Sequence, residues 1–80
     1  DVKRQFEKIF KKNKGLWEKI ERKLNRLKEN PYNSEPLKSD MKGLRSEHLP
    51  DSKVIIFRIE ENAKIIKVVR YDDHDKAYNL

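Results

Sequence analysis

The hydrophobic pattern changes its period near residue 30, and this change restricts the possible folds more than any other feature of the sequence. Before it, apolar residues recur at helical spacing on both sides of Asn13-Lys14-Gly15, which predicts two amphipathic helices. Gly15 suits the left-handed end of the first helix, and so short a connection predicts an antiparallel hairpin. The second helix is expected to end near Asn30, because Pro31 disfavours helical geometry in the residue before it. The apolar residues of the two helices are Val2, Phe6, Ile9, Phe10, Leu16, Trp17, Ile20, Leu24 and Leu27.

After the change, the chain carries a loop and then segments rich in β-branched residues. Residues 30–43 hold two prolines, two asparagines, two serines and a glycine, which predicts a loop crossing from the helices to a sheet. Extended segments are expected at Leu44–Leu49, Lys53–Ile59 and Ile65–Tyr71, and the short links between them favour antiparallel hairpins. The predicted fold is α+β, with an N-terminal antiparallel helical hairpin packed on a twisted antiparallel β-sheet. We expect one domain over residues 1–80, divided into the hairpin (1–29), the loop (30–43), the sheet (44–71) and a C-terminal turn (72–80).

The alternation of side chains along strands predicts which residues share a face of the sheet. If both links are three-residue loops, the pairing places His48, Val54 and Arg70 in one cross-strand row. The same face would also carry Ser46, Ile56, Arg58, Ile66 and Val68. The opposite face, which is expected to contact the helices, would carry Ile55, Phe57, Ile59, Ile65 and Val69.

The net charge of +6 is concentrated in the helical part of the sequence. Residues 1–30 contain eleven lysines and arginines against five acids, whereas residues 31–80 contain nine of each. A localised basic surface favours polyanions, of which nucleic acid is the commonest. The alternative is a solvated helix face that is rich in lysine for solubility.

The composition limits the size of the core and the cellular compartment. A chain of 80 residues buries only about 60% of the surface that it exposes when unfolded, so the core must be small. The absence of cysteine excludes disulfides and thiolate metal sites. No apolar run approaches the roughly 20 residues needed to span a bilayer. We therefore expect a soluble, cytoplasmic protein.

Both histidines of the sequence lie near the ends of predicted strands, close to other polar residues. Because histidine titrates near neutrality, His48 and His74 could act as general base and general acid while Arg70 stabilises charge on a phosphate. These groups suit RNA cleavage by attack of a ribose 2'-OH on the adjacent phosphate, which requires no metal in principle. Asp51 could orient His48, and Tyr78 could stack on a base or donate to phosphate. Alternatively, both histidines are ordinary solvated surface residues.

A metal site is less well supported by the sequence. His74 lies among Asp72, Asp73 and Asp75, but acids on adjacent residues do not converge easily on one ion. A paired H-x-x-x-H motif is absent, and the two glycines form no phosphate-binding loop. We expect neither a metal nor another cofactor.

The sequence contains the strings NPY, PLKSDMKGLRSEHLPDSKVIIFRI and IIKVVRYDDHDKAY, which together resemble the RelE/ParE superfamily of toxins and, within it, the branch typified by YafQ. The resemblance covers the helical hairpin loosely and residues 30–79 closely. It implies a helical hairpin on one face of a twisted antiparallel sheet, and a ribosome-dependent endoribonuclease that cleaves mRNA in the A site.

Members of this superfamily normally have a strand before the first helix, whereas the sequence given begins at Asp1 with the helical pattern. The first strand of the family is therefore either missing from the sheet or left out of the sequence given. A sheet without that strand would have an exposed edge next to Val54–Phe57 or Ile65–Val69, which favours pairing with another chain.

The resemblance also implies roles for particular residues. The residues that match catalytic positions of the branch are His48, Asp51, Arg70, His74 and Tyr78. Asp51 lies in a loop one residue shorter than the family pattern, and Ser52 follows it where the branch usually has tryptophan. The residues expected to contact RNA are Lys38, Lys42, Arg45, Lys53 and Arg58.

The implied partners are mRNA on the ribosome, ribosomal RNA, and an acidic antitoxin that covers the active face or wraps the hairpin. The same fold also supports two other functions. One is a ParE-like toxin that poisons DNA gyrase without ribonuclease chemistry, and the other is an inactive nucleic-acid-binding protein of the RelE fold. If the chain is a ribonuclease toxin, replacing His74 with alanine should abolish toxicity. If it has either of the other two functions, the same substitution should leave toxicity largely intact.

Overall fold

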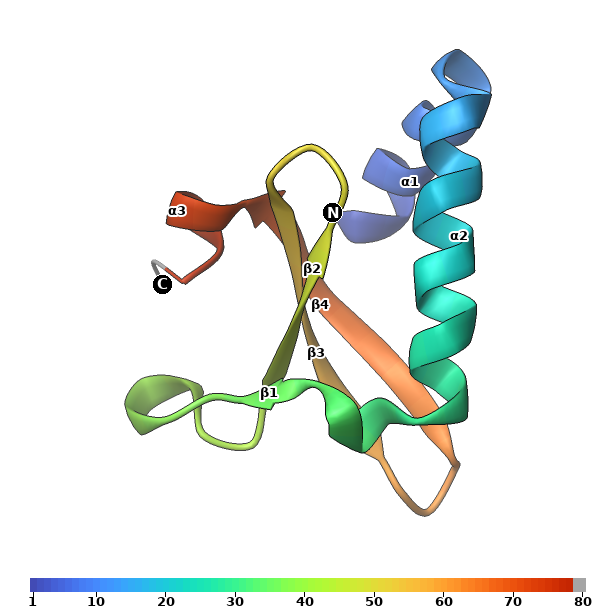
Figure 1. Cartoon of the computed structure of the whole chain (residues 1–80). Coiled ribbons are helices and arrows are strands. Elements are labelled where there is room, and N and C mark those ends of the chain that lie inside the picture. The colour runs from blue at the N-terminus through green and yellow to red at the C-terminus, as the bar shows by residue number, and fades with distance from the viewer. Residues whose placement is uncertain (79–80) are drawn as a thin grey trace.

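The computed structural model describes residues 1–78, in which two long helices lie on one side of an antiparallel sheet and a short helix lies on the other side (Figure 1). The helices are α1 (Val2–Lys12), α2 (Lys14–Glu29) and α3 (His74–Ala77), with single 3-10 turns η1 (Pro31–Asn33) and η2 (Ser39–Met41). The strands are β1 (Glu35–Pro36), β2 (Arg45–Leu49), β3 (Lys53–Glu60) and β4 (Ile65–Asp73), paired in the order β1-β2-β3-β4. The predicted α+β architecture, with its N-terminal helical hairpin, is confirmed.

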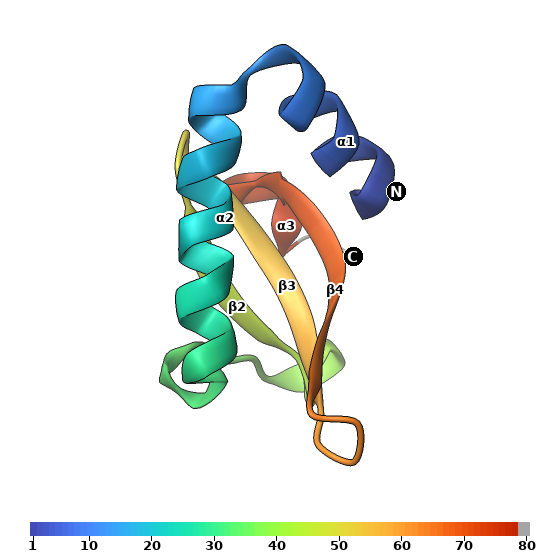
Figure 2. The ribbon, with the colours of Figure 1, turned by 90° about the vertical axis from the view of Figure 1, so that its right-hand side faces the viewer.

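The two long helices meet at a single residue, Asn13. Its backbone N–H bonds to the Ile9 carbonyl to close α1, while its side chain accepts a hydrogen bond from the Leu16 N–H to cap α2. Asparagine is a favoured N-cap residue because its short side chain reaches these unpaired amides. Gly15 lies inside the first turn of α2, so its predicted left-handed role at the end of the first helix is wrong. Figure 2 shows α2 running along the sheet and α1 turning back toward β4.

The segment between helices and sheet contains more structure than a loop. The 3-10 turns η1 and η2 flank β1, which pairs with β2 through Glu35 opposite Ser46 and Pro36 opposite Arg45. A two-residue strand with a proline carries almost no sequence signal, because proline is depleted in strands and is confined to edges. Three strands were predicted, and β1 is a fourth.

The pairing of β3 with β4 contains a bulge that the sequence does not reveal. The strands pair with Glu60 opposite Ile65, but Phe57 lies opposite Val68 while Ile56 lies opposite Arg70. Val69 is therefore the extra residue of a β-bulge, and side-chain alternation in β4 reverses there. The link between these strands also has four residues rather than three, with Lys64 in the left-handed region at φ 53°.

These two irregularities correct the predicted faces of β4. Ile66 and Val68 pack toward the helices, whereas Ile65 and Val69 are 49% and 43% exposed. Arg70 keeps its predicted face, although the predicted row with His48 is wrong. That row consists of His48, Val54 and Asp72, while Arg70 shares a row with Ile56 and Ser46.

The sheet separates two small cores. The core beneath α1 and α2 contains Ile20, Leu27, Leu49, Ile55, Phe57 and Tyr71. The core on the other face contains Met41, Val54, Ile56 and Ala77. Val54–Phe57 contributes to both and is at most 1% exposed, which explains the uninterrupted apolar run in this strand. None of the helices described in residues 1–78 is long and apolar enough to cross a membrane.

Candidate active site

The two histidines come together at the end of the sheet where β2 and β4 finish. Their imidazole centroids are 5.5 Å apart and the ring planes differ by only 6°. His48 lies near the end of β2 and His74 is the first residue of α3, and both side chains are exposed to solvent. Segments far apart in the chain thus place two titratable groups side by side on the sheet face opposite the long helices.

The short helix α3 is held in place by one buried residue and two polar contacts. Ala77 is fully buried against the second core. The Tyr78 hydroxyl donates to Ser46 Oγ at 3.1 Å, and the backbone N–H of His74 donates to the Ser52 carbonyl at 3.0 Å. Four residues cannot form a stable helix alone, so these tertiary contacts fix α3 and thereby His74.

Arg70 supports the same helix from its C-terminal end. Its Nη1 donates to the carbonyls of Lys76 at 3.1 Å and Ala77 at 3.4 Å. A cation suits this end of a helix, because its last carbonyls lack partners within the helix. The guanidinium therefore lies one helical turn from His74, and Arg70 and His74 belong to one polar group, as the sequence suggested.

The aromatic ring of Tyr78 packs against the ring of His74. Its ring centroid is 5.3 Å from that of His74, with the planes at 68°. Its hydroxyl is occupied by Ser46, which is only 3% exposed. In this arrangement Tyr78 anchors α3, and its role in stacking stays a prediction. Ser46 was not among the predicted site residues, because a buried serine in a strand gives no functional signal.

Asp51 does not lie where an orienting carboxylate is expected. It occupies the tip of the β2–β3 turn in the left-handed region at φ 64°, and no hydrogen bond within residues 1–78 joins it to His48. Asp72 instead lies in the same cross-strand row as His48, and its Oδ1 accepts the Asp73 N–H at 2.8 Å. The sequence missed Asp72 because the four-residue link and the bulge at Val69 each displace the row by one residue.

The cations predicted to contact RNA occupy different environments. Lys38 and Lys42 are exposed in the segment around η2. Arg45 is half-buried and fastens the segment around η1, since its Nε donates to Ser34 Oγ at 2.8 Å and its guanidinium carbon lies 5.4 Å from the centroid of the Tyr32 ring. Arg45 thus has a structural role whether or not it meets RNA.

The other two cations lie on opposite faces of β3. Arg58 is exposed on the histidine face and pairs with Glu60 at 3.0 Å. Lys53 lies on the helix face, where its Nζ is 2.6 Å from Asp73 Oδ1. Contact between Lys53 and RNA would require this ion pair to open.

The Lys53–Asp73 ion pair shifts both titrations. The pKa of Asp73 is lowered, first by the hydrogen bond from Lys53 and then by its charge. The pKa of Lys53 is raised chiefly by the same hydrogen bond. Both directions indicate that the two groups are charged together.

We expect the Asp73→Asn variant to lose less stability in acid than the parent protein. A lowered folded-state pKa means that the contribution of Asp73 is present above its unfolded value and is lost as the pH falls through its folded value. Lys53 contributes nothing to this loss, because its raised pKa affects stability only at strongly alkaline pH. Urea unfolding at about pH 6 and about pH 3, on either side of the usual aspartate pKa of about 3.9, measures the difference. Equal losses in the two proteins would contradict the role of the ion pair.

An open groove of about 690 Å³ lies at the other end of the sheet, where Pro31 and Tyr32 face Ile65. None of the histidine-site residues lines it. Within residues 1–78, no three His, Cys, Asp or Glu side chains gather closely enough to hold a metal ion. The candidate site within the described residues consists of the histidine pair, Arg70 and Tyr78.

Comparison with known proteins agrees with this architecture. A model of the family described as "ParE toxin of type II toxin-antitoxin system, parDE" matches residues 1–78. The chain is 38% identical over 74 residues to an uncharacterized protein of Methanosarcina mazei, which covers 92% of this chain and 86% of that protein. It is 28% identical over 73 residues to a Methanocaldococcus jannaschii protein named "Putative toxin RelE4", covering 91% and 78%. No solved structure gives a significant match.

The fold and these matches define a toxin of the RelE/ParE superfamily. Within it, the chain belongs to the ParE toxin family of type II toxin–antitoxin systems. Membership of this family implies an antitoxin as partner. The assignment to the YafQ branch stays a prediction.

Proposed function

We propose that this toxin is an endoribonuclease that cleaves mRNA in the ribosomal A site, with His48 and His74 as its general acid and base. The observation that supports the proposal most strongly is the parallel pair of imidazoles with centroids 5.5 Å apart. Two groups at this separation can reach the attacking and leaving oxygens of a single phosphodiester. The position of His74 also supports the proposal, because α3 is anchored by a buried alanine, an arginine and a serine-bound tyrosine.

In the proposed reaction, one imidazole accepts the proton of the ribose 2'-OH. The 2'-oxygen then forms a bond to the adjacent phosphorus as the bond from phosphorus to the 5'-oxygen breaks. The other imidazole, in its protonated form, gives its proton to the departing 5'-oxygen, which leaves a cyclic phosphate and a free 5'-OH. The positive charge of Arg70 favours the extra negative charge that develops on the phosphate.

The basic helices supply a means of binding the substrate complex. Most lysines and arginines of α1 and α2 are exposed, and they carry the net positive charge of the chain. Such a surface attracts ribosomal RNA through phosphate contacts, with an affinity that falls as salt rises. The proposed partners are therefore mRNA and ribosomal RNA, together with an acidic antitoxin.

Primer extension on a reporter mRNA in a reconstituted translation mixture tests this proposal. The chain and its His74→Ala variant are compared with and without ribosomes. Cuts that require both ribosomes and His74 are the expected result. Intact mRNA with a folded parent chain would contradict it.

A second function, poisoning of DNA gyrase, is favoured by one observation. The matching family is described as ParE rather than RelE. Binding to gyrase would require no proton transfer, so linear DNA from gyrase cleavage complexes would accumulate equally with the parent and with His74→Ala. That outcome, with mRNA left intact, would select this function.

A further inference from the structure

The last residue of β4 and the first residue of α3 lie on different sides of the sheet. Asp73 lies opposite Lys53 in the final register pair and points toward the helix face. The next residue, His74, donates its backbone N–H to the Ser52 carbonyl at 3.0 Å and presents its ring to His48 on the other face. The backbone conformation of Asp73 therefore determines on which side of the sheet the His74 ring lies.

Asp73 occupies the N-cap position of α3 without acting as a cap. An aspartate at this position usually accepts hydrogen bonds from backbone N–H groups of the first helical turn. Here its side chain makes no capping bond to α3, and its carboxylate is held by Lys53 at 2.6 Å. The Asp73 side chain at the start of α3 is thus held by an ion pair with the neighbouring strand rather than by local capping, beside the backbone bond from His74 to Ser52.

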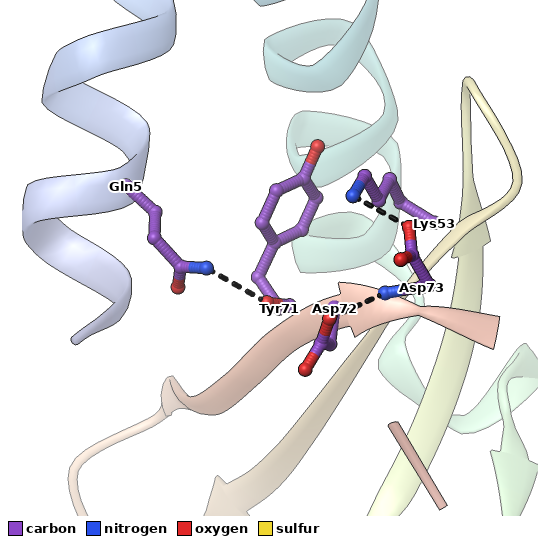
Figure 3. Close-up of polar contacts among 5 residues, drawn as sticks. All are labelled: Gln5, Lys53, Tyr71, Asp72 and Asp73. Atoms are coloured by element: carbon purple, nitrogen blue, oxygen red, sulfur yellow. Dashed lines mark hydrogen bonds and ion pairs between the residues drawn. The ribbon is translucent and has the colours of Figure 1, made fainter. Parts of the chain in front are cut away.

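Lys53 is itself held between two groups (Figure 3). Its Nζ lies 2.6 Å from Asp73 Oδ1 and 5.9 Å from the ring centroid of Tyr71, which is only 6% exposed. The backbone of Tyr71 is tied to α1, because Gln5 Nε2 donates to its carbonyl at 3.0 Å. Lys53 is therefore in contact with a well-packed part of the first core.

We propose that Lys53, through its ion pair with Asp73, is a positioning residue that holds the His74 ring beside the His48 ring from the opposite face of the sheet. The catalytic consequence rests on the proposed function, whereas the geometry of the two rings does not. The lowered pKa of Asp73 and the raised pKa of Lys53 agree with a persistent ion pair.

A purely structural ion pair gives a different expectation. Partly exposed pairs such as this one contribute little to global stability, and their loss leaves the rest of the fold unchanged. A positioning role predicts that loss of the pair separates the two rings while the protein stays folded. The rings must therefore be observed directly and without RNA, which also excludes a direct contact between Lys53 and substrate as the cause.

The experiment is NMR on histidine-labelled protein, with nuclear Overhauser contacts between the His48 and His74 rings as the readout. The variants are Lys53→Met, which removes the charge, and Lys53→Arg, which keeps it. The matched control is Lys23→Met, since Lys23 on α2 also pairs with a strand residue, at 3.6 Å from Glu47. We expect the ring contacts to be lost in Lys53→Met and kept in Lys53→Arg and Lys23→Met.

Asp73→Asn provides a second route to the same answer, because it removes the other charge and keeps the side-chain shape. Loss of the ring contacts in this variant supports the proposal even if Lys53→Met fails to fold. Contacts that persist in folded Lys53→Met or in Asp73→Asn would overturn it.

Measuring the rate of mRNA cleavage distinguishes a failure of this proposal from a failure of the proposed function. If the parent cleaves mRNA, Lys53→Met should slow cleavage by about 10²-fold, since a misplacement of about 1 Å can cost that much. Lys53→Arg should restore most of the rate. If the parent cleaves no mRNA but the rings still separate in Lys53→Met, the positioning role stands and the ribonuclease function fails.

Discussion

The His48→Ala variant is expected to cleave ribosome-bound mRNA about 10²- to 10⁴-fold more slowly than the parent, the usual contribution of a general acid or base. His48 is exposed at the end of β2, so its truncation should change stability by no more than about 0.5 kcal/mol. A loss of rate without a loss of stability would therefore identify a chemical role. Single-turnover cleavage, followed by primer extension with saturating ribosomes, gives the rate constant.

The double variant of His48 and His74 makes this prediction more specific. Groups that act in one concerted proton transfer are strongly non-additive, so the double variant should be scarcely slower than either single variant. Effects that multiply would indicate that the two residues act in separate steps. Cleavage by His48→Ala at the parent rate would remove His48 from the mechanism.

Replacing Phe57 with alanine is expected to destabilise the protein by about 3–5 kcal/mol, because the substitution leaves a cavity in the larger core. Phe57 is fully buried in β3, beneath the long helices. A domain of 80 residues has a total stability of about 4–12 kcal/mol, so the variant should be near the limit of folding. Urea unfolding followed by circular dichroism measures the change.

Phe10 is the matched control for this substitution. It lies on α1, where its side chain is 52% exposed. Its ring meets the ring of Trp17 edge-on, with the two ring centroids 6.3 Å apart. Its replacement with alanine should cost less than about 1 kcal/mol, since only part of one aromatic contact is lost. Similar losses for the two phenylalanines would show that the core is not centred on β3.

Much of the fold was predictable because the spacing of apolar residues along the sequence indicates the type of secondary structure. The helical spacing of apolar residues predicted both long helices, and the β-branched runs predicted β3 and β4. These two strands and β2, which was predicted as an extended segment, differ from the prediction only slightly at their ends. The short strand β1 and the role of Asn13 as a double cap were missed. The strand β1 depends on long-range backbone hydrogen bonds to β2, which residue type records weakly. The cap at Asn13 is local, and the preference of asparagine for the N-cap position is a signal that could have revealed it.

The candidate site was predictable in part. His48, Arg70 and His74 were expected on one polar face, and the structure gathers them around α3. The positions of Lys53 and Asp73 were not foreseen, because their pairing depends on the exact register of β3 with β4. Sequence spacing gives that register only when the strands are regular, and the extra residue Val69 makes them irregular.

The bulge at Val69 also restricts which insertions and deletions β4 can accept during evolution. On one side of it Val68 packs under the helices, and on the other side Arg70 supports α3 on the opposite face. Deletion of Val69 would leave Phe57 opposite Val68 and Ile56 opposite Arg70, so Arg70 would keep its face. Regular pairing of every residue of β4, in contrast, would bring Arg70 beneath the helices, because a shift by one residue reverses that half of the strand. Relatives that lack this residue can therefore hold α3 with the same arginine, whereas relatives of equal length without the bulge must hold it with a different side chain.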